Sequence, residues 1–279
     1  MKLFPSRIQR HQKVGRKFRN PMWRVVSASV LGTSHEQAGT PCQDACDFLR
    51  LNTGDEELLF VAIADGAGSA ALSQIGSREA VRHLLSVIPR ANLALREVTK
   101  DQVRDWMQEV LNHLTTVAER ESISLSQLDC TLLLGIIEKS RAVFAQIGDG
   151  GWVVEKDGEV VAVTWPQIGQ YANITTFITT NGALDSMQFE QLDGKISAIA
   201  GFTDGLQMLA LDFATLKAHA PFFAPMFTSV RECDDETGLI APLRGFLASD
   251  SVTARTDDDK TLVLACWRDQ ESDSNGVAQ

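Results

Sequence analysis

Uninterrupted apolar runs stand out in the hydrophobic pattern of this chain, at residues 58–64, 196–202 and 261–266. Runs of this length are typical of strands that are buried on both faces. Shorter runs, separated by turns typical of hairpins, predict four further strands at residues 131–137, 141–147, 151–156 and 160–165. Residues 23–31 alternate weakly between apolar and polar side chains and predict a first strand.

Helical spacing, in which apolar residues recur every three or four positions, predicts helices at residues 69–88 and 101–121. Two more helices are predicted farther along, at residues 206–220 and 239–249. Residues 166–195 have a poorer pattern and contain Asn-Gly and Asp-Gly turns, so we predict a surface excursion there. Because strands and helices come in blocks rather than in strict alternation, the sequence predicts an α+β fold with antiparallel sheets.

Length and composition favour one large domain over two small ones. The chain has 279 residues, of which 44% are hydrophobic, enough to bury a full core. We predict a folded domain over residues 23–268, preceded by an arm at residues 1–22 and followed by a tail at residues 269–279. No apolar stretch approaches the length of a bilayer span, and the first residues lack the apolar core of a signal peptide.

The cysteines indicate a reducing compartment. There are five, an odd number, and no two have CxxC spacing, which argues against a disulfide framework. Cys42 and Cys46 bracket Asp44, but without partner cysteines they are interpreted as packing residues. Together with the lack of a signal-peptide pattern, this composition predicts a cytoplasmic protein without a transmembrane segment.

Charge is distributed unevenly between the arm and the rest of the chain. Residues 1–24 contain eight Lys or Arg and no acid, whereas the remainder contains 18 basic against 36 acidic residues, a net charge of −18. A basic arm on an acidic body is compatible with docking on its own domain, with mobility, or with recruitment of an acidic partner such as a kinase. No aromatic interleaving or groove-reading motif accompanies the arm, so nucleic acid binding is not predicted.

Short acidic turns stand at the ends of the predicted strands. There are four of them: Gln43-Asp44, Asp65-Gly66, Thr203-Asp204-Gly205 and Asp257-Asp258-Asp259. A carboxylate at the end of a buried strand is held rigidly, and hard divalent cations prefer such oxygen ligands. Taken singly, an Asp-Gly turn is better explained as a tight reversal of the chain. If the strands are neighbours, however, the turns converge, and the sequence then predicts one carboxylate metal site.

In their order and spacing, these motifs resemble those of the metal-dependent protein phosphatase 2C family. The resemblance covers roughly residues 23–268. It rests on Gln43-Asp44, Asp65-Gly66-x-Gly68, Thr131 in an apolar strand, Gly148-Asp149, Thr203-Asp204-Gly205 and Asp258-Asp259-Lys260-Thr261. It implies a sandwich of two antiparallel β-sheets flanked by helix pairs, which agrees with the α+β pattern.

The resemblance also implies a mechanism. Two Mn²⁺ or Mg²⁺ ions would hold a bridging water that attacks the phosphorus of a phosphoserine or phosphothreonine in a protein substrate. Asp65 would bridge both ions, and the Gly66 carbonyl would complete one coordination shell. Asp204 and Asp258 would ligate the other ion, Asp258 being chosen because it stands three residues before a threonine. Asp44 would act through metal-bound water.

Three positions depart from the family pattern. Gly39 stands where many members have a phosphate-binding Arg, Ala67 where many eukaryotic members have a His, and Met208 where several have an acid for a third metal. His35 is the nearest candidate for holding the phosphate or protonating the leaving alkoxide, although a loop histidine is as often only solvated. Asp149 would position water or join a third ion site, or serve only as a turn residue.

Two other functions are compatible with parts of this pattern. A non-catalytic module that binds a phosphoprotein or a kinase would explain the missing Arg, but such a module is expected to have lost its metal carboxylates. A two-metal nuclease would need basic residues around the site, and none cluster near these turns. The sequence therefore favours a metal-dependent phosphoprotein phosphatase of signalling type, with two ions rather than three.

Overall fold

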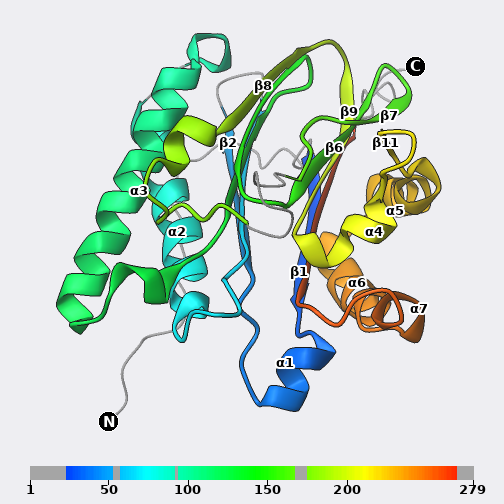
Figure 1. Cartoon of the computed structure of the whole chain (residues 1–279). Coiled ribbons are helices and arrows are strands. Elements are labelled where there is room, and N and C mark those ends of the chain that lie inside the picture. Colours follow the sequence, from blue (N-terminus) through cyan, green and yellow to red (C-terminus); the bar gives the residue numbers. More distant parts are fainter. Residues whose placement is uncertain (1–22, 53–56, 92–93, 167–174, 269–279) are drawn as a thin grey trace, which may run out of the picture.

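The computed structural model describes residues 23–52, 57–91, 94–166 and 175–268, and these form two facing five-stranded sheets (Figure 1). The β3 sheet contains, in spatial order, β2 (Ala45–Asn52), β3 (Glu57–Ala64), β4 (Leu132–Ile137), β5 (Arg141–Ile147) and β8 (Gln188–Asp193). The β12 sheet contains β1 (Trp23–Val30), β12 (Lys260–Trp267), β9 (Ile196–Phe202), β6 (Gly151–Lys156) and β7 (Glu159–Ala162). Every neighbouring pair in both sheets is antiparallel.

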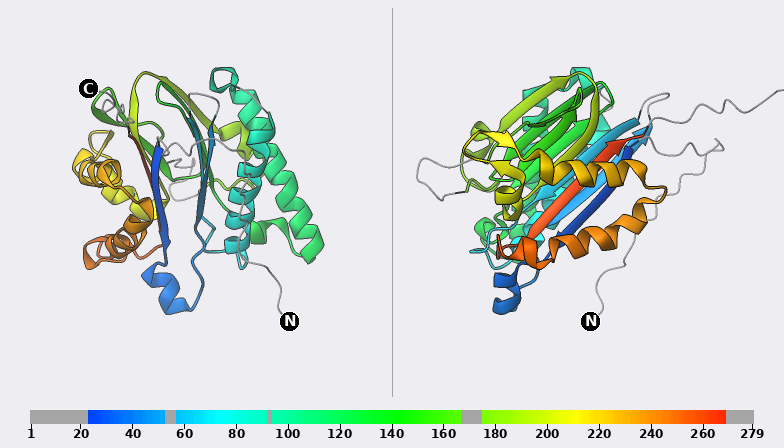
Figure 2. Two further views of the ribbon diagram at one scale, coloured as in Figure 1. Left: turned by 180° about the vertical axis from the view of Figure 1, so that it is seen from behind. Right: turned by 90° about the vertical axis from the view of Figure 1, so that its right-hand side faces the viewer.

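Helices cover the outer face of each sheet, so the molecule has four layers (Figures 1 and 2). The β3 sheet is covered by α2 (Ser73–Val87) and α3 (Lys100–Glu121). The β12 sheet is covered by α5 (Ala220–Glu232) and α6 (Ile240–Leu247), with the short α4 (Gln207–Ala210) and α7 (Asp250–Thr253) on the same side. The connection from β1 to β2 contains α1 (Thr33–Ala38). The predicted α+β sandwich of two antiparallel sheets flanked by helices is confirmed.

Burial on both faces explains the uninterrupted apolar runs. In β3, Leu59, Val61 and Ile63 lie in the core between the two sheets, whereas Phe60 and Ala62 lie in the core beneath α2 and α3. Successive side chains of a strand point to opposite faces, so a strand in the middle of four layers needs an apolar residue at every position. β12 is buried in the same way.

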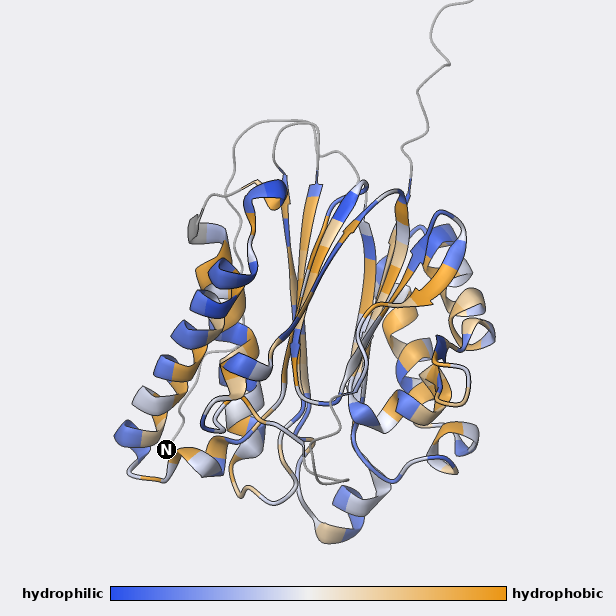
Figure 3. Cartoon of the chain, turned by 45° about the horizontal axis from the view of Figure 1, so that its top comes forward, coloured by the Kyte–Doolittle hydropathy of each residue, from blue (hydrophilic) through white to orange (hydrophobic). Residues whose placement is uncertain are grey.

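The helices, in contrast, are amphipathic, with polar residues on their outer faces (Figure 3). In α3 the predicted apolar stripe is buried, including Trp106, Met107 and Leu114. Thr99 begins this helix, because its side-chain oxygen accepts a hydrogen bond from the backbone N–H of Gln102. Among the described helices, none is both long and apolar enough to cross a membrane.

The prediction of one helix over residues 206–220 is wrong. After α4 the chain forms a hairpin of β10 (Leu211–Asp212) and β11 (Lys217–Ala218), and a longer helix, α5, begins at Ala220. The side chain of Asp212 accepts hydrogen bonds from the backbone N–H groups of Ala214 and Thr215, which favours a turn over a helix. Pro221 lies in the first turn of α5, where a missing N–H is tolerated.

The surface excursion predicted at residues 166–195 is only partly a loop. Residues 167–174 lie outside the described residues, as do the predicted arm at 1–22 and the tail at 269–279. Farther along, however, β8 pairs with β5 as an edge strand of the β3 sheet, and Ile178 is fully buried. The strand was missed because all its residues are half-buried or exposed, so its sequence lacks an apolar run.

Candidate metal centre

The acidic turns meet at one end of the sandwich. Asp65 follows β3 and Asp204 follows β9, whereas Asp44 immediately precedes β2. Asp149 lies in the turn that leads from β5 in one sheet to β6 in the other. Strand pairing fixes this convergence, because the ends that carry the turns are partners: Ala45 with Ala64, and Phe202 with both Leu262 and Gly151.

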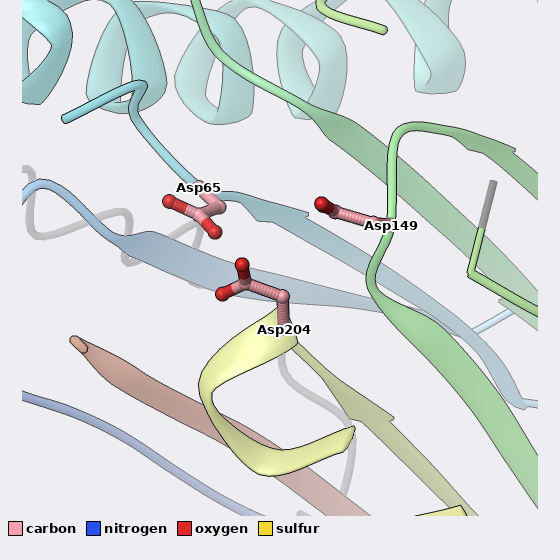
Figure 4. A group of neighbouring side chains, drawn as sticks. All are labelled: Asp65, Asp149 and Asp204. Atoms are coloured by element: carbon pink, nitrogen blue, oxygen red, sulfur yellow. The ribbon is translucent and has the colours of Figure 1, made fainter. Parts of the chain in front are cut away.

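Three carboxylates form the centre of the cluster. One ligand oxygen each of Asp65, Asp149 and Asp204 lies within 4.8 Å of the others. Figure 4 shows Asp65 and Asp204 facing each other, with Asp149 pointing toward them from the opposite side. Since the three come from both sheets, the centre exists only when the sheets pack together.

The electrostatics of the cluster call for a cation. Burial, followed by the charges of Asp44 and Asp204, raises the pKa of Asp65 well above its ordinary value. Burial and the charges of Asp149 and Asp258 raise the pKa of Asp204 to about 7. Desolvation also raises the pKa of Asp149. Carboxylates crowded in this way either take up protons or share a positive ion, because like charges at short range repel.

The donor set fits a hard divalent cation. Within the described structure, Oδ1 of Asp44, Asp149 and Asp204 is buried and has no hydrogen-bond partner. Buried polar atoms are nearly always paired, so such oxygens indicate a missing ligand. An all-oxygen set of carboxylates suits Mg²⁺ or Mn²⁺.

Asp44 is more buried than Asp65, Asp149 and Asp204 and lies outside that three-residue group. Its Oδ2 accepts hydrogen bonds from the hydroxyls of Thr203 at 2.8 Å and Thr261 at 2.7 Å. Burial and the nearby charges of Asp259 and Asp204 outweigh these bonds and raise the pKa of Asp44 to about 8. The two threonines hold one oxygen of Asp44, which leaves the other oxygen available.

Asp258 and Asp259, adjacent in sequence, occupy different environments. The side chain of Asp258 is 46% exposed, and its charge acts on Asp65 and Asp204, which places it at the rim of the cluster. Asp259 is buried and accepts hydrogen bonds from the backbone N–H groups of Gly32 and Gln43. Sequence reasoning gave Asp259 no role, because the sequence alone does not distinguish three consecutive aspartates.

His35 lies in α1 rather than in a loop, which corrects the interpretation from sequence. Its side chain is only 15% exposed, with Nδ1 2.9 Å from Oδ2 of Asp259 and Nε2 3.9 Å from Oδ1 of Asp258. A side chain added at Gly68 would lie 3.9 Å from Nε2, so the imidazole borders the Asp65 turn. Gly39 ends α1 in the left-handed conformation at φ 69°, where an arginine would be strained.

The backbone around Asp65 is held by β4. The N–H of Asp65 donates to the hydroxyl of Thr131 at 2.9 Å, and the carbonyl of Asp65 accepts from the N–H of Thr131 at 2.8 Å. Gly66 is packed so closely that an added Cβ would lie 2.8 Å from the carbonyl oxygen of Gln43 and 2.9 Å from Ser73. Close packing therefore requires a glycine at position 66, in addition to any requirement of the turn.

Comparison with known proteins identifies the family. A family model described as protein phosphatase 2C matches residues 31–248. Serine/threonine-protein phosphatase 3 of Escherichia coli is 36% identical over 252 residues, which cover 88% of this chain and 98% of that protein. The chain therefore belongs to the protein phosphatase 2C family.

Solved structures share the fold at lower identity. A serine/threonine phosphatase from Staphylococcus aureus has a TM-score of 0.60 at 15% identity, covering 91% of this chain and 99% of that chain. PppA from Pseudomonas aeruginosa, described as a key regulatory component of T6SS, has a TM-score of 0.58 at 19% identity, covering 88% and 98%. At these identities the likeness concerns the fold alone.

Proposed function

We propose that this chain hydrolyses phosphoserine and phosphothreonine in proteins at a site that holds two Mn²⁺ or Mg²⁺ ions. The observation that carries the proposal is the cluster of Asp65, Asp149 and Asp204, whose ligand oxygens lie within 4.8 Å of one another. Membership of the protein phosphatase 2C family and 36% identity to a bacterial serine/threonine-protein phosphatase support the reaction type.

Several residues would hold the ions. Asp65 belongs to this group of carboxylates and would bridge the two ions, together with the Gly66 carbonyl on one of them. Asp204 and Asp258 would bind the second ion. From the sequence, Asp149 was either a turn residue or a residue that positions water or binds a third ion. It belongs to the cluster and would contribute its unpaired Oδ1. Bound divalent ions supply charge neutralisation at the phosphoryl group and an activated water.

The chain's own residues contribute positioning and hydrogen bonds. Asp44, held by Thr203 and Thr261, offers its free oxygen to orient a water toward phosphorus. His35 has one ring nitrogen beside Asp259 and the other toward the Asp65 turn, so it would donate a hydrogen bond to the phosphate or to the leaving oxygen. It would thereby take over part of the role of the arginine that Gly39 replaces.

A non-catalytic module that binds a phosphoprotein or a kinase is the other function considered. Such a module has no use for several buried carboxylates that each leave one oxygen without a hydrogen-bond partner, because their desolvation and mutual repulsion destabilise the fold. We therefore favour the enzyme, with a phosphorylated protein as substrate. A cognate kinase remains a proposed partner through the basic segment at residues 1–24.

The decisive experiment combines turnover with metal dependence. The purified protein with Mn²⁺ should release phosphate from an aryl phosphate and from a phosphothreonine peptide. A chelator should abolish release, and the Asp65→Asn change should reduce it by roughly 10³-fold. Calorimetry on the same samples would measure Mn²⁺ binding separately. Mn²⁺ binding without turnover on any phosphorylated substrate would contradict the enzyme and favour the binding module.

A further inference from the structure

A hollow of about 550 Å³ opens beside the metal centre, between α4, the β10–β11 hairpin and the start of α5. Its wall is mixed. Met208, Leu211, Phe213 and Phe222 form an apolar part, Asp212 and His219 are polar, and Arg255 completes the wall from the segment after α7. A volume of this size accommodates one bulky side chain and part of its backbone.

The hollow exposes side chains that are unusual at a protein surface. Met208 is 68% exposed and Phe213 is 37% exposed, the latter packed edge-on against Trp165 with ring centroids 5.9 Å apart. Within the described residues, the side chain of Arg255 makes no hydrogen bond or ion pair, although the body of the protein is strongly acidic. An exposed apolar surface beside an unpaired cation has the chemistry of a binding site.

Two residues that line the hollow are close in the chain to residues of the metal centre: Met208 follows Asp204 by four residues, and Arg255 precedes Asp258 by three. Gln207, the residue before Met208, donates a 2.6 Å hydrogen bond from its side chain to the carbonyl oxygen of Asp149. Asp258 lies at the rim of the carboxylate cluster. One path for a polypeptide whose phosphorylated residue reaches the cluster therefore runs over this hollow.

We infer that the hollow binds the substrate segment next to the phosphorylated residue, with a bulky apolar side chain against Met208 and Phe213 and an acidic side chain on Arg255. The inference rests on the proposed phosphatase function and names its substrate class. Proteins carrying phosphoserine or phosphothreonine beside an apolar and an acidic residue are the preferred substrates. Burial of the substrate's apolar side chain against the apolar part of the wall favours binding. The guanidinium of Arg255 favours a substrate that carries a carboxylate.

Two sets of phosphothreonine peptides test this. One set carries Leu and Asp beside the phosphothreonine, on either its N-terminal or its C-terminal side, and the other carries Ser at the same positions. The wild-type protein should hydrolyse one Leu-Asp peptide with kcat/KM about tenfold above its Ser counterpart. Met208→Ser and Arg255→Glu should each lower the ratio of kcat/KM between the Leu-Asp and Ser peptides. In addition, Arg255→Glu should prefer a peptide with Lys in place of Asp.

An aryl phosphate, which has no flanking residues, separates docking from chemistry. Both variants should hydrolyse it at the wild-type rate. Leu216→Ser and Arg96→Glu are matched controls, because Leu216 is 69% exposed but does not line the hollow, and Arg96 is exposed beyond α2 on the opposite helix layer. Neither control should alter the ratio between peptides.

Several results would overturn the inference. One is an equal kcat/KM of the wild-type protein for the Leu-Asp and Ser peptides. Another is a parallel loss of aryl phosphate hydrolysis in both variants. A third is a change in the ratio of kcat/KM between the peptides that is as large in the controls as in the variants. Failure of the wild-type protein to hydrolyse the aryl phosphate with Mn²⁺ would instead contradict the phosphatase function itself, and this inference with it.

Discussion

The backbone N–H of Gln43 donates a 2.6 Å hydrogen bond to Oδ2 of Asp259, a residue 216 positions away. Oδ1 of the same carboxylate accepts a 2.7 Å hydrogen bond from the N–H of Gly32. These charge-assisted bonds tie both ends of the segment that carries His35 to the start of β12. Asp44 follows Gln43 directly, so Asp259 positions a proposed catalytic carboxylate through the backbone.

This arrangement predicts opposite consequences for two neighbouring aspartates. Asp259→Ala should lower the free energy of unfolding by about 3 kcal/mol, because two buried N–H groups lose a charged acceptor. Asp258→Ala should leave it within about 0.5 kcal/mol when metal is chelated, but should weaken Mn²⁺ binding. Urea unfolding with chelator and Mn²⁺ titration of both variants measure the two effects. Equal loss of stability in both variants would contradict the assignment.

Asp65→Asn should separate stability from activity. The variant should lose roughly 10³-fold in kcat/KM on an aryl phosphate, the order seen when a group that stabilises transition-state charge is removed. In the presence of a chelator, however, it should unfold at higher temperature than the wild-type protein, because one of the mutually repelling carboxylates is gone. A lower melting temperature of the chelated variant would argue against a repulsive cluster.

The raised carboxyl pKa values predict how stability depends on pH without metal. The pKa of Asp44 rises from 3.8 to about 8 and that of Asp204 from 3.8 to about 7, so between these limits the folded state binds more protons than the unfolded state. The free energy of unfolding should therefore fall as pH increases from about 4 to about 8.

Chemical unfolding in chelator at pH 5, 6.5 and 8 would measure this fall. Saturating Mn²⁺ should reduce it, since metal ions bind the deprotonated carboxylates and stabilise the folded state most at high pH. Asp204→Asn should flatten the dependence on pH in chelator. An unchanged slope in this variant would contradict the assignment of the pH effect to the cluster.

His35→Ala should affect substrates according to their leaving groups. Hydrolysis of a phosphothreonine peptide should fall by about 10²-fold, because the departing alkoxide loses a hydrogen-bond donor. Hydrolysis of an aryl phosphate with an acidic phenol should fall much less, since that leaving group needs little assistance. Mn²⁺ half-saturation should stay unchanged, and equal losses on both substrates would remove His35 from the leaving-group side of the site.

Thr261→Val tests the support of Asp44. Removing the hydroxyl deletes one of the two hydrogen bonds to Oδ2 of Asp44 and should further raise the pKa of a carboxyl that is already at about 8. In chelator, we expect the titration midpoint of Asp44 followed by NMR to increase while protein stability changes by about 1 kcal/mol or less. An unchanged midpoint for Asp44 would contradict this support by Thr261.

The sequence predicted most of the strands because the physical reason for each was local. A strand such as β3, in the middle of four layers, needs an apolar side chain at every position, and this requirement is visible as a run. The edge strands β2 and β8 escaped detection because their residues are half-buried or exposed, so no apolar run marks them. The hairpin at β10 and β11 was mistaken for a helix because Asp212 and its turn outweigh the spacing of neighbouring leucines.

The sequence by itself determined the layered α+β fold, the family motifs and the positions of the acidic turns, because these follow from runs, spacing and residue type. Only the tertiary structure decided that Asp149 joins Asp65 and Asp204, and that Asp259 is buried while Asp258 reaches the rim. The reason is geometric. Convergence of side chains from two sheets depends on how strand ends pair across 19 to 60 residues, and no local pattern encodes that pairing.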